Sequence, residues 1–205
     1  MPKAPTKLIQ PLSPQDIDMI TSVINKATPQ GQRDYVILAT MLDCGLRVSE
    51  VCGITLDNLN LSQGSIRVMG KGWKERNVPV GQFVTSLLCH YVDYERPKLN
   101  GKGSDYLFLS QGGNPVTSNA IKLMFSRLAK KSGVTRLHAH LCRHTFAVNY
   151  LLNGGDIFTL KEILGHTTLE MVNHYLHFTR AQITDQHRKY SPMDRLSLTR
   201  SDRGQ

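Results

Sequence analysis

Residues 138–175 read HAHLCRHTFAVNYLLNGGDIFTLKEILGHTTLEMVNHY. The stretch opens with histidines around an arginine, passes the glycine pair Gly154-Gly155, and reaches another histidine at His166. Hydrophobic residues recur at helical spacing before and after the glycine pair, so the sequence predicts one helix that the glycines end and a second that follows it. The last residue, Tyr175, lies nine positions after His166. A packed core has little use for a tyrosine at that position, so Tyr175 is a candidate for chemistry.

Outside this stretch, capping residues and hydrophobic periodicity predict further helices. Ser13-Pro14-Gln15-Asp16 is a typical helix start, Gly45 is placed to end a helix, and Thr117 is placed to cap another. A capping box at Thr167–Glu170 starts the helix that carries Tyr175. The other helices are expected over residues 14–26, 32–44, 47–52, 81–95, 117–131, 140–153 and 156–164.

Between residues 59 and 80 the hydrophobic period changes to that of strands. Ser65–Met69 and Arg76–Val80 alternate, and GKGWKE between them predicts a hairpin tip. We therefore expect a mainly α fold with a small antiparallel β-sheet, in the α+β class. Residues 1–12 carry three prolines and two lysines and predict an arm or linker. Residues 13–178 are expected to form one domain, and residues 179–205 a polar C-terminal tail.

The composition favours a polyanionic partner. The chain has 205 residues, 40% of them hydrophobic, which is enough for one packed domain. Its net charge is +9, and no Asp or Glu occurs between Tyr106 and Gly155. The cations of that block are Lys122, Arg127, Lys130, Lys131, Arg136 and Arg143. A phosphate backbone is the partner that such a block favours. The four cysteines form no CxxC pair, and no segment resembles a signal peptide or a membrane span, so we expect a soluble cytoplasmic protein.

Two of four short motifs lie in the first half of the chain. In Gly45-Leu46-Arg47-Val48-Ser49-Glu50 the arginine and the glutamate are three residues apart, so they share one helix face and can pair. A guanidinium held by a carboxylate binds phosphate well, although an ordinary surface salt bridge has the same spacing. In Gly70-Lys71-Gly72 the glycines let the lysine approach a ligand closely, although a solvent-exposed turn has the same composition.

The other two motifs lie within residues 138–175. His140 and Arg143 are one turn apart near a helix N-terminus, where the helix dipole favours an anion. The histidines of this segment are alternatively spaced as metal ligands, but no carboxylate or cysteine pair completes a ligand set. His166 precedes a capped helix and is expected to be exposed, close in sequence to Tyr175. We expect structural roles for His138, Cys142 and His144.

In this order, the motifs resemble those of the tyrosine recombinase, or phage integrase, family. The catalytic domain of that family carries an arginine in G-x-R-x-x-E, a hairpin lysine, an H-x-x-R element, an L-G-H histidine and a tyrosine shortly afterwards. All of these elements are present here, between about residues 13 and 180. The chain has Cys142-Arg143-His144 where the family commonly has Leu-Arg-His, and this difference leaves the H-x-x-R spacing intact.

The resemblance implies a role for each matching residue. Tyr175 would attack a DNA phosphodiester, giving a 3′-phosphotyrosyl link and a free 5′-hydroxyl, and Lys71 would protonate the leaving oxygen. Glu50 would orient its neighbours. The phosphate would be bound by Arg47, His140, Arg143 and His166, and of these His140 would also assist the tyrosine proton. Because these side chains do the electrostatic work, the resemblance implies no metal ion and no other cofactor.

The implied partner is double-stranded DNA, which would be bound by Lys74, Arg76, Lys122, Arg127, Lys130 and Lys131. The resemblance also implies a homo-oligomer, a tetramer on paired sites, in which the C-terminal tail docks on a neighbouring subunit, and accessory DNA-bending proteins. Family members usually have a further N-terminal helical domain that closes around DNA. We therefore expect this chain to be the catalytic domain, and to bind DNA weakly by itself.

The expected activity is site-specific recombination of DNA in the bacterial nucleoid, for the integration or excision of a mobile element. Two alternatives stay open. A type IB topoisomerase uses the same tyrosine chemistry to nick and reseal one strand, and a non-catalytic module of the same fold would only bind DNA. The short interval between Leu164-Gly165-His166 and Tyr175 favours the recombinase, and a mere binder has no need of Tyr175.

Overall fold

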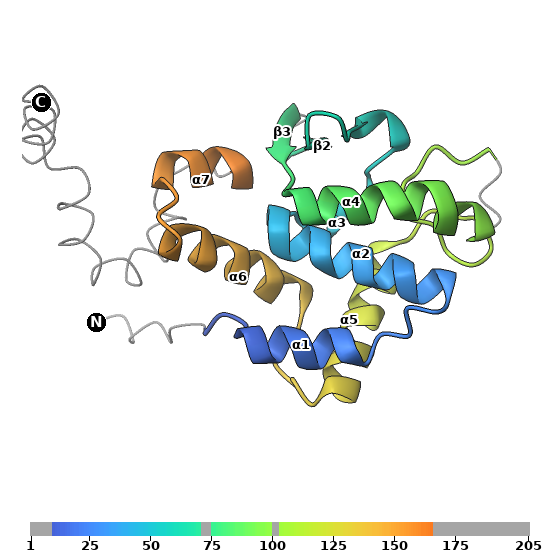
Figure 1. The fold of residues 1–205 in the computed structure, drawn as a ribbon, viewed down its shortest axis with the longest axis horizontal. Coiled ribbons are helices and arrows are strands. Elements are labelled where there is room, and N and C mark those ends of the chain that lie inside the picture. Colours follow the sequence, from blue (N-terminus) through green and yellow to red (C-terminus); the bar gives the residue numbers. More distant parts are fainter. Residues whose placement is uncertain (1–9, 71–74, 100–102, 166–205) are drawn as a thin grey trace, which may run out of the picture.

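The computed structural model describes residues 10–70, 75–99 and 103–165 (Figure 1). These residues form a mainly helical fold with one small antiparallel sheet, as the sequence predicts. The α-helices are α1 (Pro14–Ser22), α2 (Pro29–Cys44), α3 (Val48–Cys52), α4 (Gln82–His90), α5 (Ser118–Ser132), α6 (Ala139–Leu152) and α7 (Ile157–Leu164). The short helical turns are η1 (Leu56–Asn58), η2 (Tyr91–Glu95) and η3 (Arg96–Leu99).

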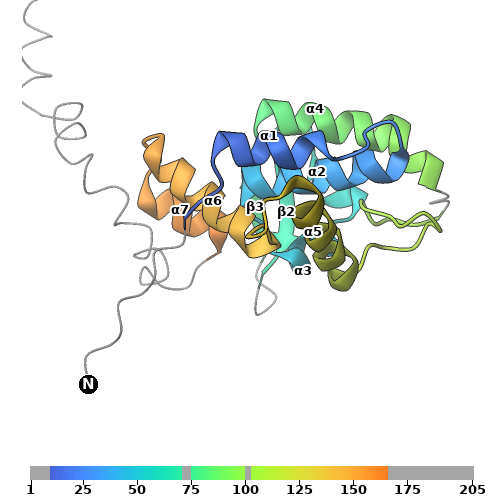
Figure 2. The same ribbon diagram turned by 90° about the horizontal axis from the view of Figure 1, so that it is seen from below.

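Helix α2 runs through the middle of the described fold and packs against α4 and α6. Figure 2 shows α4 and α5 on opposite sides of it. Thr28 caps its N-terminus by accepting a hydrogen bond from the Gly31 N–H, and Pro29 occupies its first turn. Gly45 ends the helix in the left-handed conformation, with φ of 62°. The apolar side chains of this helix that fill the core are at most 1% exposed; they are Val36, Ile37, Leu38, Met41 and Cys44.

The sheet has the order β1-β2-β3, and both of its strand pairs are antiparallel. The strands are β1 (Leu59–Asn60), β2 (Ser65–Met69) and β3 (Glu75–Pro79). Ile66 pairs with Val78, and Val68 pairs with Arg76. The apolar members of these pairs are buried, which is the alternation expected of a sheet with one covered face. The predicted antiparallel strand pair is confirmed in β2 and β3, whereas most of the predicted tip lies outside the described residues and the two-residue β1 was not predicted.

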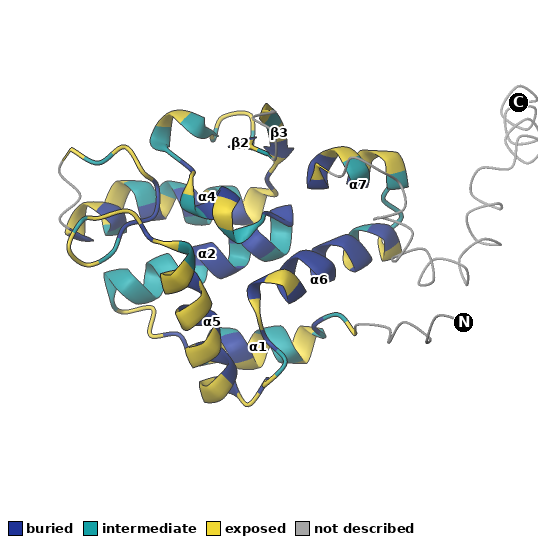
Figure 3. Ribbon diagram, turned by 180° about the vertical axis from the view of Figure 1, so that it is seen from behind, coloured by how far each residue is buried: buried dark blue, intermediate teal, exposed yellow. Residues whose placement is uncertain are grey.

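Helix α6 is nearly buried along its length, as Figure 3 shows, because α2 covers one side of it and α7 another. Asp156 caps α7 by accepting from the Thr159 N–H at 2.7 Å, as predicted. The close packing of α6 and α7 requires a glycine at position 45. A Cβ there would overlap the Phe146 ring and the Leu164 side chain, in addition to the strain of its positive φ.

The N-terminal end of the described chain is packed more tightly than an arm would be. Leu12 is 2% exposed, and its N–H donates to the Thr145 hydroxyl at 2.9 Å. Arg136 binds the Pro11 carbonyl and Asp16, which ties this end to the segment before α6. Residues 10–12, which the sequence assigned to an arm, therefore belong to the folded domain, and the arm prediction for residues 1–9 falls outside the described part of the chain.

Helix α1 ends at Ser22, earlier than the predicted end near residue 26. The Asn25 side chain accepts from the Ala27 N–H, and the Asn25 carbonyl accepts from the Thr28 N–H. This local turn competes with helix continuation. Ile24 is nevertheless buried, because the turn returns it to the core. Across the three described ranges, no helix combines the length and the apolar content that crossing a bilayer requires.

Candidate active site

Three arginines from three different elements bind successive carbonyl groups at the end of α7. Arg76 Nε donates to the Ile163 carbonyl at 2.8 Å, and Arg143 Nη2 donates to the Leu164 carbonyl at 2.7 Å. Arg47 Nη2 lies 3.4 Å from the Gly165 carbonyl. Guanidinium groups are favourable here because the last carbonyls of a helix lack intrahelical donors and carry its negative dipole end. The backbone that leads into the Leu-Gly-His motif is therefore fixed from α3, β3 and α6.

Glu50 lies between two of these arginines and is almost completely buried, with 2% of its side chain exposed. Its Oε1 accepts from Arg47 Nη1 and from Arg76 Nη1, each at 2.8 Å. Its Oε2 accepts from the Arg47 backbone N–H at 2.8 Å and from Arg76 Nη2 at 3.0 Å. Burial alone raises the pKa of the Glu50 carboxyl, but the hydrogen bonds from Arg76 and from the Arg47 N–H outweigh burial, so the net pKa is lowered.

The predicted pairing of Arg47 with Glu50 is confirmed, in a geometry that differs from the expected one. Arg47 is the N-cap residue of α3, with extended φ and ψ, and Glu50 reaches back to its backbone N–H. About a third of the Arg47 side chain is exposed, 35%, so its guanidinium is held on one side and open on the other. A guanidinium held in this way is pre-organised to bind an anion.

Arg143 is deeply placed at the start of α6 and is only 3% exposed. Its Nη1 donates to the Gly45 carbonyl at 2.6 Å, and its Nη2 donates to Leu164. It therefore joins the end of α2 to the end of α7. His140, one turn earlier, reaches the surface. Partial desolvation lowers the pKa of His140, and the charges of Arg143, His138 and Arg47 lower it further, so the neutral form of the imidazole is favoured.

His138 has the structural role that the sequence predicts. It is the N-cap residue of α6, and its Nδ1 accepts from the Leu141 N–H at 3.2 Å. Cys142 is fully buried, and burial raises the pKa of its thiol, so it packs as an apolar residue. His144 is also buried. Within residues 10–70, 75–99 and 103–165, no three His, Cys, Asp or Glu side chains are grouped to hold a metal ion.

The predicted DNA-binding cations that lie in the described residues fall into two groups. Those on α5 are all exposed, and they are Lys122, Arg127, Lys130 and Lys131. Arg76 is different, because its side chain is only 13% exposed and its guanidinium points into the protein, onto Glu50 and the Ile163 carbonyl. The sequence gives no sign of this inward placement, because the partners are 26 and 87 residues away.

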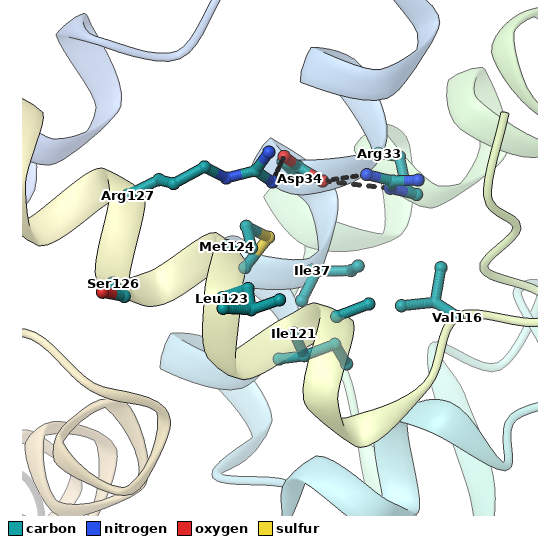
Figure 4. Close-up of a pocket in the computed structure, with 10 residues that line it drawn as sticks. Arg33, Asp34, Ile37, Val116, Ile121, Leu123, Met124, Ser126 and Arg127 are labelled. Atoms are coloured by element: carbon teal, nitrogen blue, oxygen red, sulfur yellow. Dashed lines mark hydrogen bonds and ion pairs between the residues drawn. The ribbon is translucent and has the colours of Figure 1, made fainter.

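A cavity of about 350 Å³ lies between α2 and α5. Figure 4 shows Arg33 and Arg127 on either side of Asp34 at its edge, with Ile37 and Ile121 among its apolar lining residues. None of the predicted catalytic residues lines it. The cavity is therefore separate from the arginine cluster at the end of α7.

Four predicted residues lie outside the described residues: Lys71, Lys74, His166 and Tyr175. The described structure reaches the flanks of their segments. Strands β2 and β3 lead to and from the hairpin tip, and α7 ends at Leu164, two residues before His166. The predicted helix after Thr167 and the C-terminal tail also fall in the part of the chain that is not described.

Comparison with known proteins agrees with the motif spacing. Residues 10–182 match the Phage integrase family. The chain is 34% identical over 197 residues to a protein of Bacillus pumilus named tyrosine recombinase XerC. The match covers 94% of this chain and 65% of that protein, so the chain spans just under two thirds of the curated relatives it matches.

Solved structures of phage and transposon integrases share the fold. One is the catalytic domain of bacteriophage HP1 integrase, with a TM-score of 0.66 and 25% identity, covering 91% of this chain and 97% of that one. Another is the Tn1549 transposon integrase in complex with transposon right end DNA, with a TM-score of 0.71 and 25% identity, covering 89% of this chain and 66% of that one. With the fold, the arginine cluster and the matched sequence in agreement, this chain belongs to the phage integrase family.

Proposed function

We propose that the chain catalyses site-specific recombination of DNA by tyrosine-mediated cleavage and rejoining. The observation that carries this proposal is the arginine cluster at the end of α7. Arg47 and Arg143 come from segments about a hundred residues apart and meet at Leu164 and Gly165, beside His140. The segment that they fix leads directly to the Leu-Gly-His motif and Tyr175.

In the proposed reaction, the Tyr175 oxygen attacks a DNA phosphorus and gives up its proton, for which the neutral His140 is a suitable acceptor. The bond from phosphorus to the 5′-oxygen breaks, and Lys71 protonates that oxygen to leave a 5′-hydroxyl. Arg47 and Arg143, with His140 and His166, stabilise the charge that gathers on the non-bridging oxygens. The 3′-phosphotyrosyl link conserves the bond energy, so attack by another 5′-hydroxyl reseals DNA without a nucleotide cofactor.

Residues 13–178 would form the catalytic domain in this proposal, and Leu12 packs with it. Double-stranded DNA is the proposed partner, since a related transposon integrase was solved on transposon DNA. The exposed cations of α5 would bind the phosphate backbone, as would Lys74. Because the proposed partner is DNA, the proposed site of action is the bacterial nucleoid. The proposed role is integration or excision of a mobile element. Accessory DNA-bending proteins are proposed as further partners.

The experiment that tests the function is the capture of a covalent adduct. The chain is incubated with a duplex library that has a randomised central segment and a nick, so that the cleaved end is lost and resealing is blocked. Adducts that survive SDS are recovered, and their DNA is sequenced. We expect the protein on a 3′-phosphate and a free 5′-hydroxyl, with excess chelator causing no loss. DNA binding without any adduct would instead identify a non-catalytic module.

The captured sequences also separate recombinase from topoisomerase. A plasmid that carries two copies of the recovered site is expected to yield recombinant products. Relaxation of supercoils without exchange between the two copies would favour the type IB topoisomerase alternative.

We further propose that the chain acts as a tetramer on paired sites, and that residues 179–205 dock on a neighbouring subunit. Deletion of residues 180–205 is expected to abolish the tetrameric complex on DNA in sedimentation, with one protein still bound to each site. The full chain, measured in the same buffer and on the same DNA, is the reference. An unchanged tetramer and unchanged adduct formation after the deletion would refute the docking role.

A further inference from the structure

We propose that Arg76 is a positioning residue that joins the β-hairpin to the phosphate-binding arginine and to the end of α7, and that it does not itself bind DNA. The inference rests on the proposed function for its catalytic consequence. The sequence predicted that Arg76 contacts DNA, whereas the proposal gives Arg76 a positioning role within the same site.

All of the nitrogens of the Arg76 guanidinium donate within the protein. Nη1 and Nη2 form a fork onto the two Glu50 oxygens at 2.8 and 3.0 Å, and Nε donates to the Ile163 carbonyl at 2.8 Å. A bidentate guanidinium–carboxylate pair of this geometry has a fixed orientation that a lysine cannot reproduce. With 13% of its side chain exposed, Arg76 has little surface to offer to a phosphate backbone.

The plane of the Arg76 guanidinium also lies close to Gly165. A Cβ at Gly165 would be 3.1 Å from both Cζ and Nη1 of Arg76, and 3.2 Å from its Nε. Gly165 has a φ of 62°, so both its conformation and its neighbour favour glycine. The first two residues of the Leu-Gly-His motif are thus packed and hydrogen-bonded against a set of arginines, one of which comes from the hairpin.

Three parts of the proposed site meet at Arg76. It stands in β3, five residues after Lys71, and pairs with Val68 of β2. Through Glu50 it fixes the guanidinium of Arg47, and through Ile163 it fixes the backbone that leads to His166. A displacement of about 1 Å at a reacting group can cost about 10²-fold in rate. Loss of the Arg76 hydrogen bonds to Glu50 and Ile163 is therefore expected to slow DNA cleavage more than it weakens DNA binding.

The test compares Arg76→Lys with Arg67→Gln, on the full chain. Lysine keeps a positive charge beside Glu50 but cannot make the fork and the Ile163 bond together. Arg67 is an exposed arginine on the neighbouring strand, so its replacement removes charge from the same sheet and leaves the Arg76 hydrogen bonds in place. The substrate is the DNA sequence recovered in the capture experiment, at a concentration that saturates the protein. Under these conditions Arg76→Lys is expected to form the covalent adduct about 10²-fold more slowly than the unmodified chain. Its DNA affinity and salt dependence are expected to match those of the unmodified chain.

A phosphate contact predicts a different result. If Arg76 bound DNA, Arg76→Gln would reduce the slope of log affinity against log salt by about one. That result, or wild-type adduct rates in Arg76→Lys, would overturn the proposal. Thermal unfolding is measured first. If Arg76→Lys is unfolded, the double variant Glu50→Gln with Arg76→Gln, which removes both charges together, takes its place in each measurement.

Hydrogen exchange without DNA keeps this test separate from the test of function. The amides of residues 157–165 are expected to exchange faster in Arg76→Lys, and at the original rate in Arg67→Gln. If the amides of residues 157–165 exchanged at the original rate in Arg76→Lys, the positioning role of Arg76 would be refuted even if the chain proved to be a recombinase. Conversely, a chain that forms no adduct at all would refute the function, while the exchange experiment would still decide whether Arg76 holds α7.

Discussion

Tyr175→Phe is expected to abolish the covalent protein–DNA adduct completely while DNA binding continues. Phenylalanine keeps the ring but lacks the oxygen that attacks phosphorus, so no phosphotyrosyl bond can form. The measurement is the fraction of labelled nicked duplex that stays attached to the chain in SDS, together with a binding titration in the same buffer. The variant should equal the unmodified chain in the titration and give no attached DNA.

Tyr150→Phe is the matched control for this experiment. Tyr150 is a half-buried tyrosine of α6 whose ring lies 5.7 Å from that of Phe146 and packs over Gly155. It has no place in the proposed chemistry, so its phenylalanine variant should still form the adduct. An adduct that persists in Tyr175→Phe would show that another side chain is the nucleophile, and the proposed assignment would be wrong.

Glu50→Ala is expected to destabilise the folded domain by about 3–5 kcal/mol, as breaking a buried ion pair does when one partner is removed. The carboxylate accepts four hydrogen bonds, from Arg47 and Arg76. Without it, the Arg76 guanidinium is left largely buried beside Arg47 with no carboxylate to balance either charge. The measurement is the free energy of unfolding in urea at pH 7. The matched control is Glu162→Ala, an exposed glutamate of α7, for which a change within about 0.5 kcal/mol is expected.

The Glu50 contribution should also depend on pH, in a direction that its environment fixes. Its pKa in the folded state is below the ordinary value of 4.5, so its ionised form stabilises the fold. That stabilisation is complete above the unfolded-state pKa and is lost as the pH falls through the folded-state pKa. The stability difference between the unmodified chain and Glu50→Gln should therefore be constant near neutral pH and shrink below about pH 4.5. A difference that grows on acidification would contradict this ionisation.

Local signals in the sequence predicted the helices well because the cap residues act on their own neighbours. Ser13, Thr117 and Asp156 each accept from a backbone N–H three residues ahead, as their positions before hydrophobic runs indicate. Gly45 ends α2 for an equally local reason, its positive φ. The motif order likewise placed Arg47 with Glu50 and near Arg143 and His140, because the family pattern carries information on long-range contacts.

What the sequence did not predict depends on distant backbone groups. Arg143 donates to the Gly45 and Leu164 carbonyls, and Arg76 Nε donates to the Ile163 carbonyl; any residue supplies such a carbonyl, so no side-chain pattern marks these contacts. Arg76 at the end of a cationic hairpin has the sequence context of a surface residue, and only the fold shows that it points inward. Strand β1 is too short to show periodicity, and Leu12 stands among prolines that suggest a linker.

The arginines of the cluster at the end of α7 bind groups that lie far away along the chain, and this separation bears on when in folding the proposed site is assembled. Arg47 and its acceptor are 118 residues apart, Arg143 and Gly45 are 98 apart, and Arg76 and Ile163 are 87 apart. Contacts of such long range form late in folding, after local helices, and during synthesis their later partners emerge last. A nascent or half-folded chain would thus carry the basic helix α5, which is proposed to bind DNA, without the assembled arginine cluster that is proposed to bind the phosphate. If the proposed function holds, only a molecule that has finished folding would therefore be able to cleave a DNA strand.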